Sequence, residues 1–151
     1  MADITTVWDE TYGDWVQLGA ALQAGDDIVT AVLISIFTDA LAAPDDEIPD
    51  GSGDPRGWWG DAYSTSPIGS KLWLYERSKK TGQVLAGVRA AIAESVQWLV
   101  DDGVAASVDV QCWWVASSGA SGFLGCIVTV AQPSGGASKV QFQTAWGGPI
   151  A

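Results

Sequence analysis

The chain has 151 residues, 48 % of them hydrophobic, with 18 acidic and 7 basic side chains and a formal net charge of −11. This composition predicts a single folded domain over residues 1–151, and the negative surface disfavours nucleic acids and anionic membranes as partners. The sequence has no histidine and only two cysteines, which removes the commonest general base and excludes a cysteine-based zinc site.

The amino-terminal residues predict neither export nor membrane insertion. They show no basic-then-apolar signal pattern, and no run in the chain reaches the roughly 20 apolar residues of a membrane span. We therefore expect the chain to remain in the cytoplasm of the cell that makes it.

The first third of the chain predicts a β-hairpin followed by a helix. Residues 3–22 contain two β-favouring stretches, with a turn expected at Gly13-Asp14. Over residues 28–41 apolar side chains recur at helical spacing, and either Asp26 or Asp27 can cap this helix. Because the helix is apolar on most sides, we expect it to be covered on several faces.

Two further helices are predicted before residue 103. A short one is expected over residues 71–80, with Ser70 as its N-cap. A longer one is expected over residues 83–100, where Thr81 can serve as N-cap and Gly103 supplies the stop. Apolar residues line one face of the longer helix: Leu85, Val88, Ile92, Val96 and Leu99.

The last third of the chain predicts three β-strands, because apolar and polar residues alternate in three successive segments. Loops rich in glycine and serine, residues 116–122 and 132–137, join the segments and favour an antiparallel meander. The expected buried positions are Val108, Val110, Cys112 and Trp114, then Leu124, Cys126, Val128 and Val130, then Val140, Phe142 and Trp146.

Together these elements predict an α+β fold. An amino-terminal β-hairpin, two longer helices and a short one are expected to pack on one face of a carboxy-terminal three-stranded antiparallel meander. If the first loop of the meander is centred on Gly119, Cys112 and Cys126 face each other across the hairpin. In a reducing cytoplasm we expect them as paired core thiols rather than as a disulfide.

A long connection, residues 42–66, carries the most distinctive stretch of the chain. In residues 54–61, Trp58 and Trp59 stand between glycines, and Pro55 excludes a helix, so a shaped loop is predicted. Connections of this length are uncommon in compact domains and often functional. Either both indoles pack as a lid on their own domain, the commoner fate of aromatic side chains, or they are presented to a partner. The sequence is also compatible with one of the two indoles pointing into the domain and the other pointing outward.

Arg56, in the same stretch, has two interpretations. It is expected to form an ion pair with Asp54 or Asp61 that holds the loop closed. Alternatively it contacts an acidic group on a partner, because arginine and tryptophan are preferred anchors of protein interfaces.

The last predicted strand, residues 139–146, is a candidate edge for pairing with another chain. Its outward-facing residues, Lys139, Gln141 and Gln143, carry little charge, whereas natural edges are normally protected against pairing. Either a partner strand is added here, or the amino-terminal hairpin covers the edge.

No catalytic or metal site is predicted. Acidic residues crowd the long connection, and glycosidases use paired carboxyl groups, but nothing apolar surrounds most of these acids to raise a pKa. Residues 50–54 place oxygen ligands at alternate positions, but the glycine and glutamate that complete a calcium loop are missing. We therefore predict no enzyme, no cofactor and no dedicated metal site. The crowded acids are Asp45, Asp46, Glu47, Asp50, Asp54 and Asp61.

Five stretches of the chain carry a family resemblance: residues 30–39, 48–51, 54–61, 69–74 and 97–103. In this order, with the Trp-Trp stretch as the most specific, they resemble the small baseplate family of Mu-like contractile-tailed phages. The resemblance extends over roughly residues 3–130. It implies a structural component of the phage tail baseplate, related in fold to the small lysozyme-like wedge protein of the T-even phages.

The resemblance also implies two docking surfaces. A larger wedge subunit would bind the helical and Trp-Trp side, and the tail sheath protein would begin its first ring by adding a strand to the last sheet edge. Six or a multiple of six copies would stand in a six-fold baseplate of the virion, after assembly in the host cytoplasm. The interface residues expected are Arg56, Trp58, Trp59, Asp61, Asp101, Asp102, Lys139, Gln141 and Gln143.

One departure from the family pattern and two rival functions remain. The wider wedge family has a Glu-Pro-Arg signature between its last long helix and first long strand, whereas residues 98–103 of this chain contain no such signature. The ionic contacts of that signature therefore cannot be carried over. The rival functions are a lysozyme-like tail enzyme that degrades peptidoglycan, and a tail assembly chaperone or adaptor.

Overall fold

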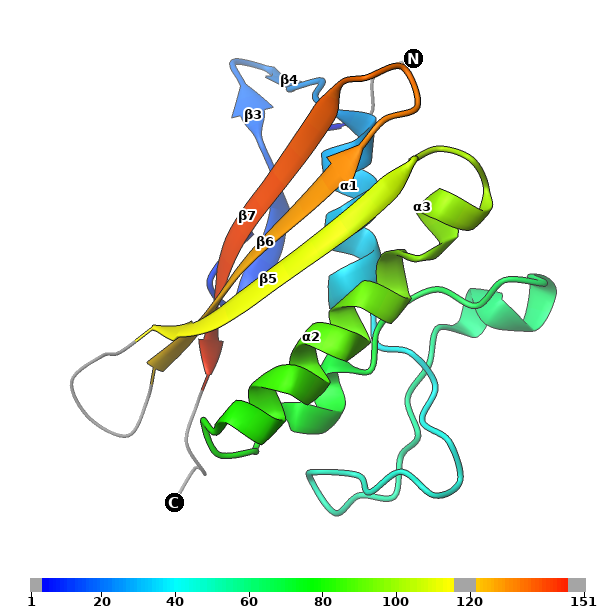
Figure 1. The fold of residues 1–151 in the computed structure, drawn as a ribbon, viewed down its shortest axis with the longest axis vertical. Helices are drawn as coiled ribbons and strands as arrows, with labels where there is room; N and C mark the ends of the chain where they lie inside the picture. Colours follow the sequence, from blue (N-terminus) through cyan, green and yellow to red (C-terminus); the bar gives the residue numbers. More distant parts are fainter. Residues whose placement is uncertain (1–3, 116–121, 147–151) are drawn as a thin grey trace.

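A computed structural model describes residues 4–115 and 122–146 of the chain. A three-stranded antiparallel sheet crosses the molecule, and the two longer helices lie against one of its faces (Figure 1). The predicted α+β class and the carboxy-terminal meander are confirmed. The strands of the meander are β5 (Ser107–Val115), β6 (Gly122–Ala131) and β7 (Ala137–Trp146), in that spatial order.

The register of the sheet places alternate side chains in the core, as the sequence pattern predicted. Cys112 on β5 pairs with Cys126 on β6, which pairs in turn with Phe142 on β7. The predicted facing of the two cysteines is confirmed; both thiols are free, with their sulfur atoms 3.5 Å apart. The expected centre of the first loop, Gly119, lies outside the described residues. On the central strand the fully buried side chains are Leu124, Cys126, Val128 and Val130.

The amino-terminal segment is extended, as predicted, but it forms two small ribbons instead of one hairpin. An isolated bridge between Ile4 and Ala24 brings the two ends of this segment together. The first ribbon pairs β1 (Thr6–Asp9) with β2 (Tyr12–Trp15), and the second pairs β3 (Gln17–Leu18) with β4 (Ala21–Leu22).

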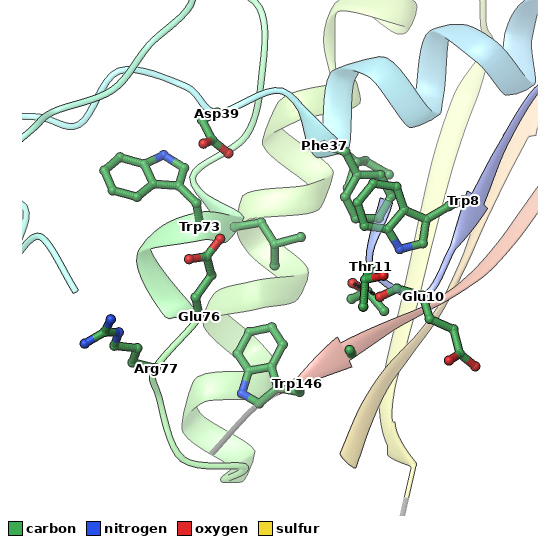
Figure 2. A pocket seen from close by; sticks show the side chains of 13 residues that line it. Trp8, Glu10, Thr11, Phe37, Asp39, Trp73, Glu76, Arg77 and Trp146 are labelled. Atoms are coloured by element: carbon green, nitrogen blue, oxygen red, sulfur yellow. Dashed lines mark hydrogen bonds between the residues drawn. The ribbon is translucent and has the colours of Figure 1, made fainter. Parts of the chain in front are cut away.

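The turn of the first ribbon lies at Glu10 and Thr11, so the predicted turn at Gly13-Asp14 was wrong. Gly13 lies within β2 opposite Trp8, and a Cβ there would stand 3.6 Å from the indole ring. That distance is ordinary van der Waals contact, so Gly13 lies within a strand without a steric need for glycine. Trp8 in turn stacks on Phe37 with 3.5 Å between ring centroids, which joins the ribbon to the first helix (Figure 2).

The first helix, α1 (Asp27–Phe37), is shorter than predicted. Asp26 is its N-cap and accepts a hydrogen bond from a backbone N–H of the first turn. The predicted end at Leu41 was wrong because the backbone N–H of Ser70 donates to the Thr38 carbonyl oxygen (2.9 Å). Pairing with a distant segment thus takes the chain out of the helix, although the apolar periodicity continues.

The segment after Ser70 is less helical than predicted. In place of a helix over residues 71–80, one 3-10 turn forms, η2 (Leu72–Tyr75). The indole N–H of Trp146 donates to the Ser78 carbonyl oxygen (2.9 Å), one of the carbonyl groups that the predicted helix would leave unpaired at its end. This contact ties the end of β7 to the segment after η2.

The predicted long helix is present but interrupted. It consists of α2 (Gly82–Val96) and a short α3 (Trp98–Asp101), and Thr81 is confirmed as the N-cap of α2. The indole N–H of Trp98 donates to the Ser35 hydroxyl of α1 (3.0 Å). This contact ties α3 to α1.

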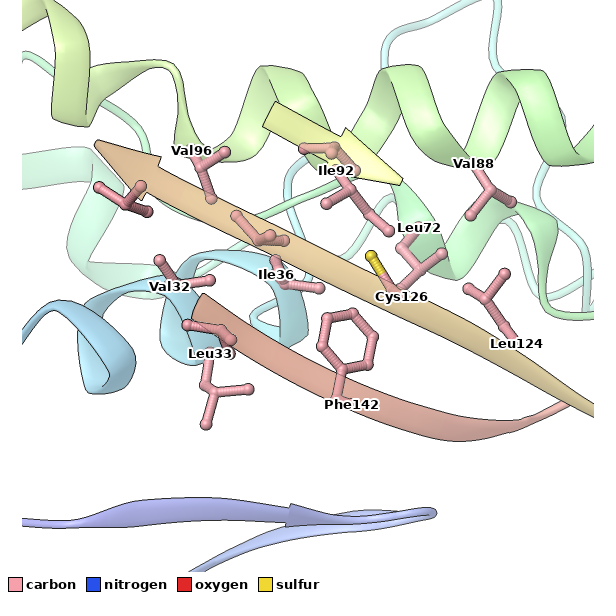
Figure 3. Close-up of a cluster of buried hydrophobic side chains, with 14 of the residues drawn as sticks. Val32, Leu33, Ile36, Leu72, Val88, Ile92, Val96, Leu124, Cys126 and Phe142 are labelled. Atoms are coloured by element: carbon pink, nitrogen blue, oxygen red, sulfur yellow. The ribbon is translucent and has the colours of Figure 1, made fainter. Parts of the chain in front are cut away.

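The core lies between the sheet and the two longer helices (Figure 3). Each helix contributes a buried stripe at helical spacing, as predicted for the longer one. As expected, α1 is covered on several faces, by α2, β1 and β7, and it is open on one side, where Ile34 is exposed. The fully buried side chains from the helices are Val32, Ile36, Val88, Ile92, Val96 and Leu99.

Candidate functional site

An exposed aromatic patch lies on the long connection between α1 and η2. It surrounds a short 3-10 helix, η1 (Trp59–Tyr63), in which Trp59 is 76 % exposed and Tyr63 is 86 % exposed. Trp58 is 43 % exposed and tilts against Trp59, with 5.5 Å between ring centroids. The interpretation of the tryptophans as a closed lid was therefore wrong for Trp59. We define the aromatic patch as Leu41, Trp58, Trp59 and Tyr63.

Close packing and hydrogen bonds fix the loop that carries the aromatic patch. The ring of Trp58 covers Gly60 so closely that any side chain at that position would clash. The carboxylate of Asp61 accepts a hydrogen bond from the backbone N–H of Ile68 (3.0 Å). An ordered loop loses little conformational entropy on docking, so the patch is well prepared to bind.

Arg56 anchors the loop to the body of the protein. Its guanidinium lies 2.9 Å from the Asp39 carboxylate at the end of α1. The same group lies over the ring of Trp73 on η2, 4.5 Å from the ring centroid. Asp50 and Glu76 are weaker ionic partners, each 3.8 Å away. One cation therefore serves three carboxylates.

The predicted ionic partners of Arg56 were wrong, although its predicted role in closing the loop has a structural counterpart. Asp54 accepts a hydrogen bond from the backbone N–H of Arg56 (2.9 Å). Asp61 is used by Ile68, as described above. Both carboxylates are therefore used by nearby backbone groups, and the side chain of Arg56 reaches residues that are distant in the sequence.

A second ion pair fixes the acidic part of the same connection. The ammonium of Lys71 lies 2.7 Å from the Asp46 carboxylate. The hydrogen bond from Lys71, and then one from the backbone of Ala43, lower the pKa of Asp46. Hydrogen bonds from Ser52 lower the pKa of Asp50. These carboxyl groups stay ionised at neutral pH, so they are poorly suited to protonate a leaving group.

Of the other acidic side chains of the connection, Asp45, Glu47 and Asp54 are exposed and Asp61 is half-buried. Within residues 4–115 and 122–146, no group of three or more potential ligands comes together to hold a metal ion. In the same ranges, no helix is long and apolar enough to cross a membrane.

The edge of β7 is covered at one end and open at the other. The backbone N–H of Ala145 donates to the carbonyl oxygen of Glu10 in the β1–β2 turn (2.6 Å). An isolated parallel bridge between Glu10 and Thr144 lies at the same end, and in the described part of the chain no backbone hydrogen bond from outside the sheet is found farther along β7. Lys139 and Gln141 are exposed, and Gln143 is half-buried. Both predicted alternatives, a covered and an open edge, thus apply to different halves of the strand.

Asp101 and Asp102 lie apart from the other candidate surfaces. They are exposed at the end of α3, where Gly103 adopts the left-handed φ of 75° that ends many helices. The Asp101 carboxylate accepts a hydrogen bond from Gln97 (3.2 Å). Because α3 lies beside β5, these acids are at the opposite edge of the sheet from β7 (Figure 1). The predicted interface residues therefore occupy three separate places.

Two members of the aromatic patch, Leu41 and Tyr63, were not predicted as site residues. Leu41 was assigned to the first helix, and only the early end of α1 brings it against Gly57. Tyr63 follows Trp59 by one turn of a helix, a spacing that brings aromatic rings together. The spacing of Trp59 and Tyr63 could therefore have predicted that Tyr63 joins the patch. Nothing in the sequence around Leu41 could have predicted its place there.

The model of the phage protein GP46 family matches residues 28–137 of this chain. The chain belongs to this family. Baseplate protein gp46 of Escherichia phage Mu is 36 % identical over 148 residues, which cover 98 % of this chain and 99 % of that protein. The Mu-like prophage FluMu protein gp46 of Haemophilus influenzae is 33 % identical over 147 residues, which cover 97 % and 98 %. The resemblance inferred from the Trp-Trp stretch is thereby confirmed.

The GP46 family match includes the aromatic patch, the Arg56 anchor and both longer helices. The amino-terminal ribbons and most of β7 lie outside residues 28–137. The two relatives align over nearly their whole length, and those alignments extend to both ends of the chain.

Proposed function

We propose that this chain is a structural component of the tail baseplate of a Mu-like contractile-tailed phage. The observation that carries the proposal is the 36 % identity to the baseplate protein of phage Mu, over almost the whole of both chains. The protein would act as one wedge-like domain, located in the virion after assembly in the host cytoplasm. A six-fold baseplate would hold six copies or a multiple of six.

The aromatic patch is the proposed docking site for a larger wedge subunit. Trp59 and Tyr63 offer large apolar area on an ordered loop, and tryptophan and tyrosine are enriched among interface hot spots. Arg56 and Asp61 support this surface from behind by holding the loop. Asp101 and Asp102 would form an acidic contact of their own, at the end of α3.

The open half of β7 is the proposed site where a strand of the tail sheath protein is added. Lys139 and Gln141 are exposed there, and Gln143 is partly covered where Glu10 reaches the strand. Strand addition supplies a row of backbone hydrogen bonds, which gives affinity with little demand on side chains. An edge that ends against the ribbon turn would also fix the register of the added strand.

The proposed role is architectural and non-enzymatic. The carboxyl groups Asp46 and Asp50 have lowered pKa values, the opposite of what a glycosidase acid requires, whereas Glu76 has a raised one. The identity to a baseplate protein over almost the whole of both chains supports the structural role over a peptidoglycan-degrading enzyme or a free assembly chaperone.

The proposal is tested by purifying virions that carry wild-type chain or Trp59→Ala and analysing them by mass spectrometry. Wild-type chain is expected in baseplates. Trp59→Ala should fold normally, because the side chain is mostly exposed, but should weaken docking by about 30-fold, as loss of a hot-spot residue costs about 2 kcal/mol. The variant should therefore be depleted from the particles.

Trp15→Ala is the matched control, because Trp15 is similarly exposed (60 %) on the first ribbon and lies outside the aromatic patch. It should enter particles normally. Wild-type chain found only in lysates of infected cells would overturn the structural role. A Trp59→Ala chain that unfolds would show that the patch belongs to the core.

A further inference from the structure

A cleft of about 410 Å³ opens beside the Arg56 anchor and belongs to none of the surfaces described above. It lies between η2, the end of α1, the β1–β2 turn and the end of β7 (Figure 2). Four aromatic side chains from four different elements line it: Trp8, Phe37, Trp73 and Trp146. Because these residues are far apart in the sequence, only the fold brings them together.

The aromatic walls of the cleft are fixed before any ligand binds. The rings of Trp8 and Phe37 are stacked nearly parallel, at 4°. The indole N–H of Trp73 donates to the Ala40 carbonyl oxygen (2.9 Å), and that of Trp146 is held by Ser78. Because Trp8 and Phe37 cover each other and Arg56 already lies over the Trp73 ring, these walls offer apolar contact rather than free ring faces.

One wall of the cleft is also negatively charged. Asp39 and Glu76 stand beside Trp73, whereas Arg77 extends away from the hollow (Figure 2). Arg56 is the shared ion-pair partner of Asp39, Glu76 and Asp50, and Arg77 acts on Glu76 and Asp50 from farther away, so the carboxylates still outnumber the cations.

Glu76 is the acid of this wall that is held least firmly by a cation. Partial burial raises its pKa most, Arg56 acts in the opposite direction, and repulsion from Asp39 and Asp50 adds to the rise while Arg77 opposes it. Its carboxylate is half-exposed, and its contact with Arg56 is long, at 3.8 Å. A second cation in the cleft would therefore meet an acid that is poorly neutralised.

We propose that this cleft binds a lysine or arginine side chain of a neighbouring protein, with the alkyl stem against the aromatic walls and the cationic end at Glu76. The proposal rests on the proposed function, which supplies the neighbouring subunit. An anionic side chain would be repelled, and an apolar one would leave Glu76 with only its long contact to Arg56. A long basic side chain matches both the walls and the charge.

The test is a ¹H–¹⁵N titration of the isolated full chain with the methylamides of N-acetyl-lysine, N-acetyl-arginine and N-acetyl-norleucine. The indole N–H signals of Trp8 and Trp146, assigned by single tryptophan-to-phenylalanine substitutions, report on the cleft. The indole of Trp113, which packs over Gly125 on the sheet, is the remote reference. Both basic probes should shift the cleft signals in a saturable way at millimolar concentration, and the norleucine probe should bind at least about 5-fold more weakly.

Glu76→Gln and Glu94→Gln form a matched pair, since each removes one negative charge from an exposed glutamate. Only Glu76→Gln should weaken the basic probes, by at least about 3-fold. Equal binding of norleucine, equal losses in the two variants, or shifts centred on Trp113 would each overturn the proposal. Because this titration needs no virion, its failure would leave the mass-spectrometry test of the baseplate role unaffected.

Discussion

Arg56 occupies a backbone conformation that arginine rarely adopts. Its φ is +54°, in the left-handed region, where a side chain other than glycine costs about 1–2 kcal/mol. The ion pair with Asp39 and the contact with the Trp73 ring offset this cost. The backbone of Arg56 is therefore strained, and the contacts of its own side chain offset that strain.

Arg56→Gly should be more stable than Arg56→Ala. Both variants lose the guanidinium, but only glycine relieves the left-handed strain, so the free energy of unfolding should be higher for glycine by about 0.5–1 kcal/mol. Urea unfolding followed by far-ultraviolet circular dichroism measures the difference.

The control pair for this prediction is Arg89→Gly and Arg89→Ala, because Arg89 lies within α2. In a helix glycine is less stable than alanine by about 1 kcal/mol, so the order should reverse. The same order at both positions would contradict the assignment of strain to Arg56.

The residues that could be predicted from the sequence are those whose partners are close in the chain. The capping roles of Asp26 and Thr81 depend on residues two or three positions away. Arg56 was expected to act locally, but its main carboxylate partner is Asp39, 17 positions away. The exposure of Trp59 was not predictable either, because it depends on what the rest of the fold leaves uncovered.

Asp26 has two roles, and they set the stability of two elements at once. One carboxylate oxygen caps α1 through the backbone N–H of Ile28. The other accepts a hydrogen bond from the hydroxyl of Ser138 on β7 (3.2 Å). Thr81, by comparison, caps only α2.

Asp26→Ala should therefore destabilise the protein more than Thr81→Ala. Loss of a cap costs about 1 kcal/mol, and loss of the buried acceptor for Ser138 adds about 1 kcal/mol. Denaturant unfolding of both variants and of Ser138→Ala measures these contributions. Equal losses for Asp26→Ala and Thr81→Ala would show that the Ser138 contact contributes nothing.

Among the helices and strands, prediction succeeded where the apolar periodicity met no competing contact from a distant part of the chain. Alternation gave the three strands of the meander, because the sheet buries one face over its whole length. Periodicity failed at the end of α1, where Ser70 brings a competing hydrogen bond from elsewhere, and over residues 71–80, where one 3-10 turn forms in place of a helix. Such competition is invisible to a periodicity that counts only apolar residues.

The charge of the whole molecule makes its stability depend on pH. The pKa of Glu76 is raised above its ordinary 4.5, so the native chain takes up this proton more readily than the unfolded chain. The pKa values of Asp46 and Asp50 are lowered from 3.8, so their contribution is present above that pH and is lost below it. The net charge of −11 also falls as the pH approaches the isoelectric point of about 4.1.

The free energy of unfolding should therefore rise as the pH is lowered from 7 to about 4.5, and fall below about 3.8. Urea titrations at a series of pH values and low protein concentration measure this profile. Glu76→Gln should flatten part of the rise. A stability that decreases steadily from pH 7 downward would contradict the raised pKa.

At the scale of the whole molecule, the candidate surfaces lie at two sides of the sheet. The end of α3 and the loop that carries η1 lie on the β5 side, and β7 is the opposite edge (Figure 1). The sequence predicted their residues but not this separation, because it has no local signal. Separate surfaces suit a protein proposed to stand between several neighbours in an assembly.

The residues that hold the loop in place are different from the residues that the loop exposes to solvent. Asp39 and Trp73 hold the loop from behind, whereas Trp59 and Tyr63 face solvent in front and take no part in that hold. Substitutions on the front can therefore alter which protein is recognised without changing how the loop stands. Under the proposed docking role, related phages could therefore differ in the neighbouring protein that Trp59 and Tyr63 contact, while Arg56, Asp39 and Trp73 hold the loop in the same way.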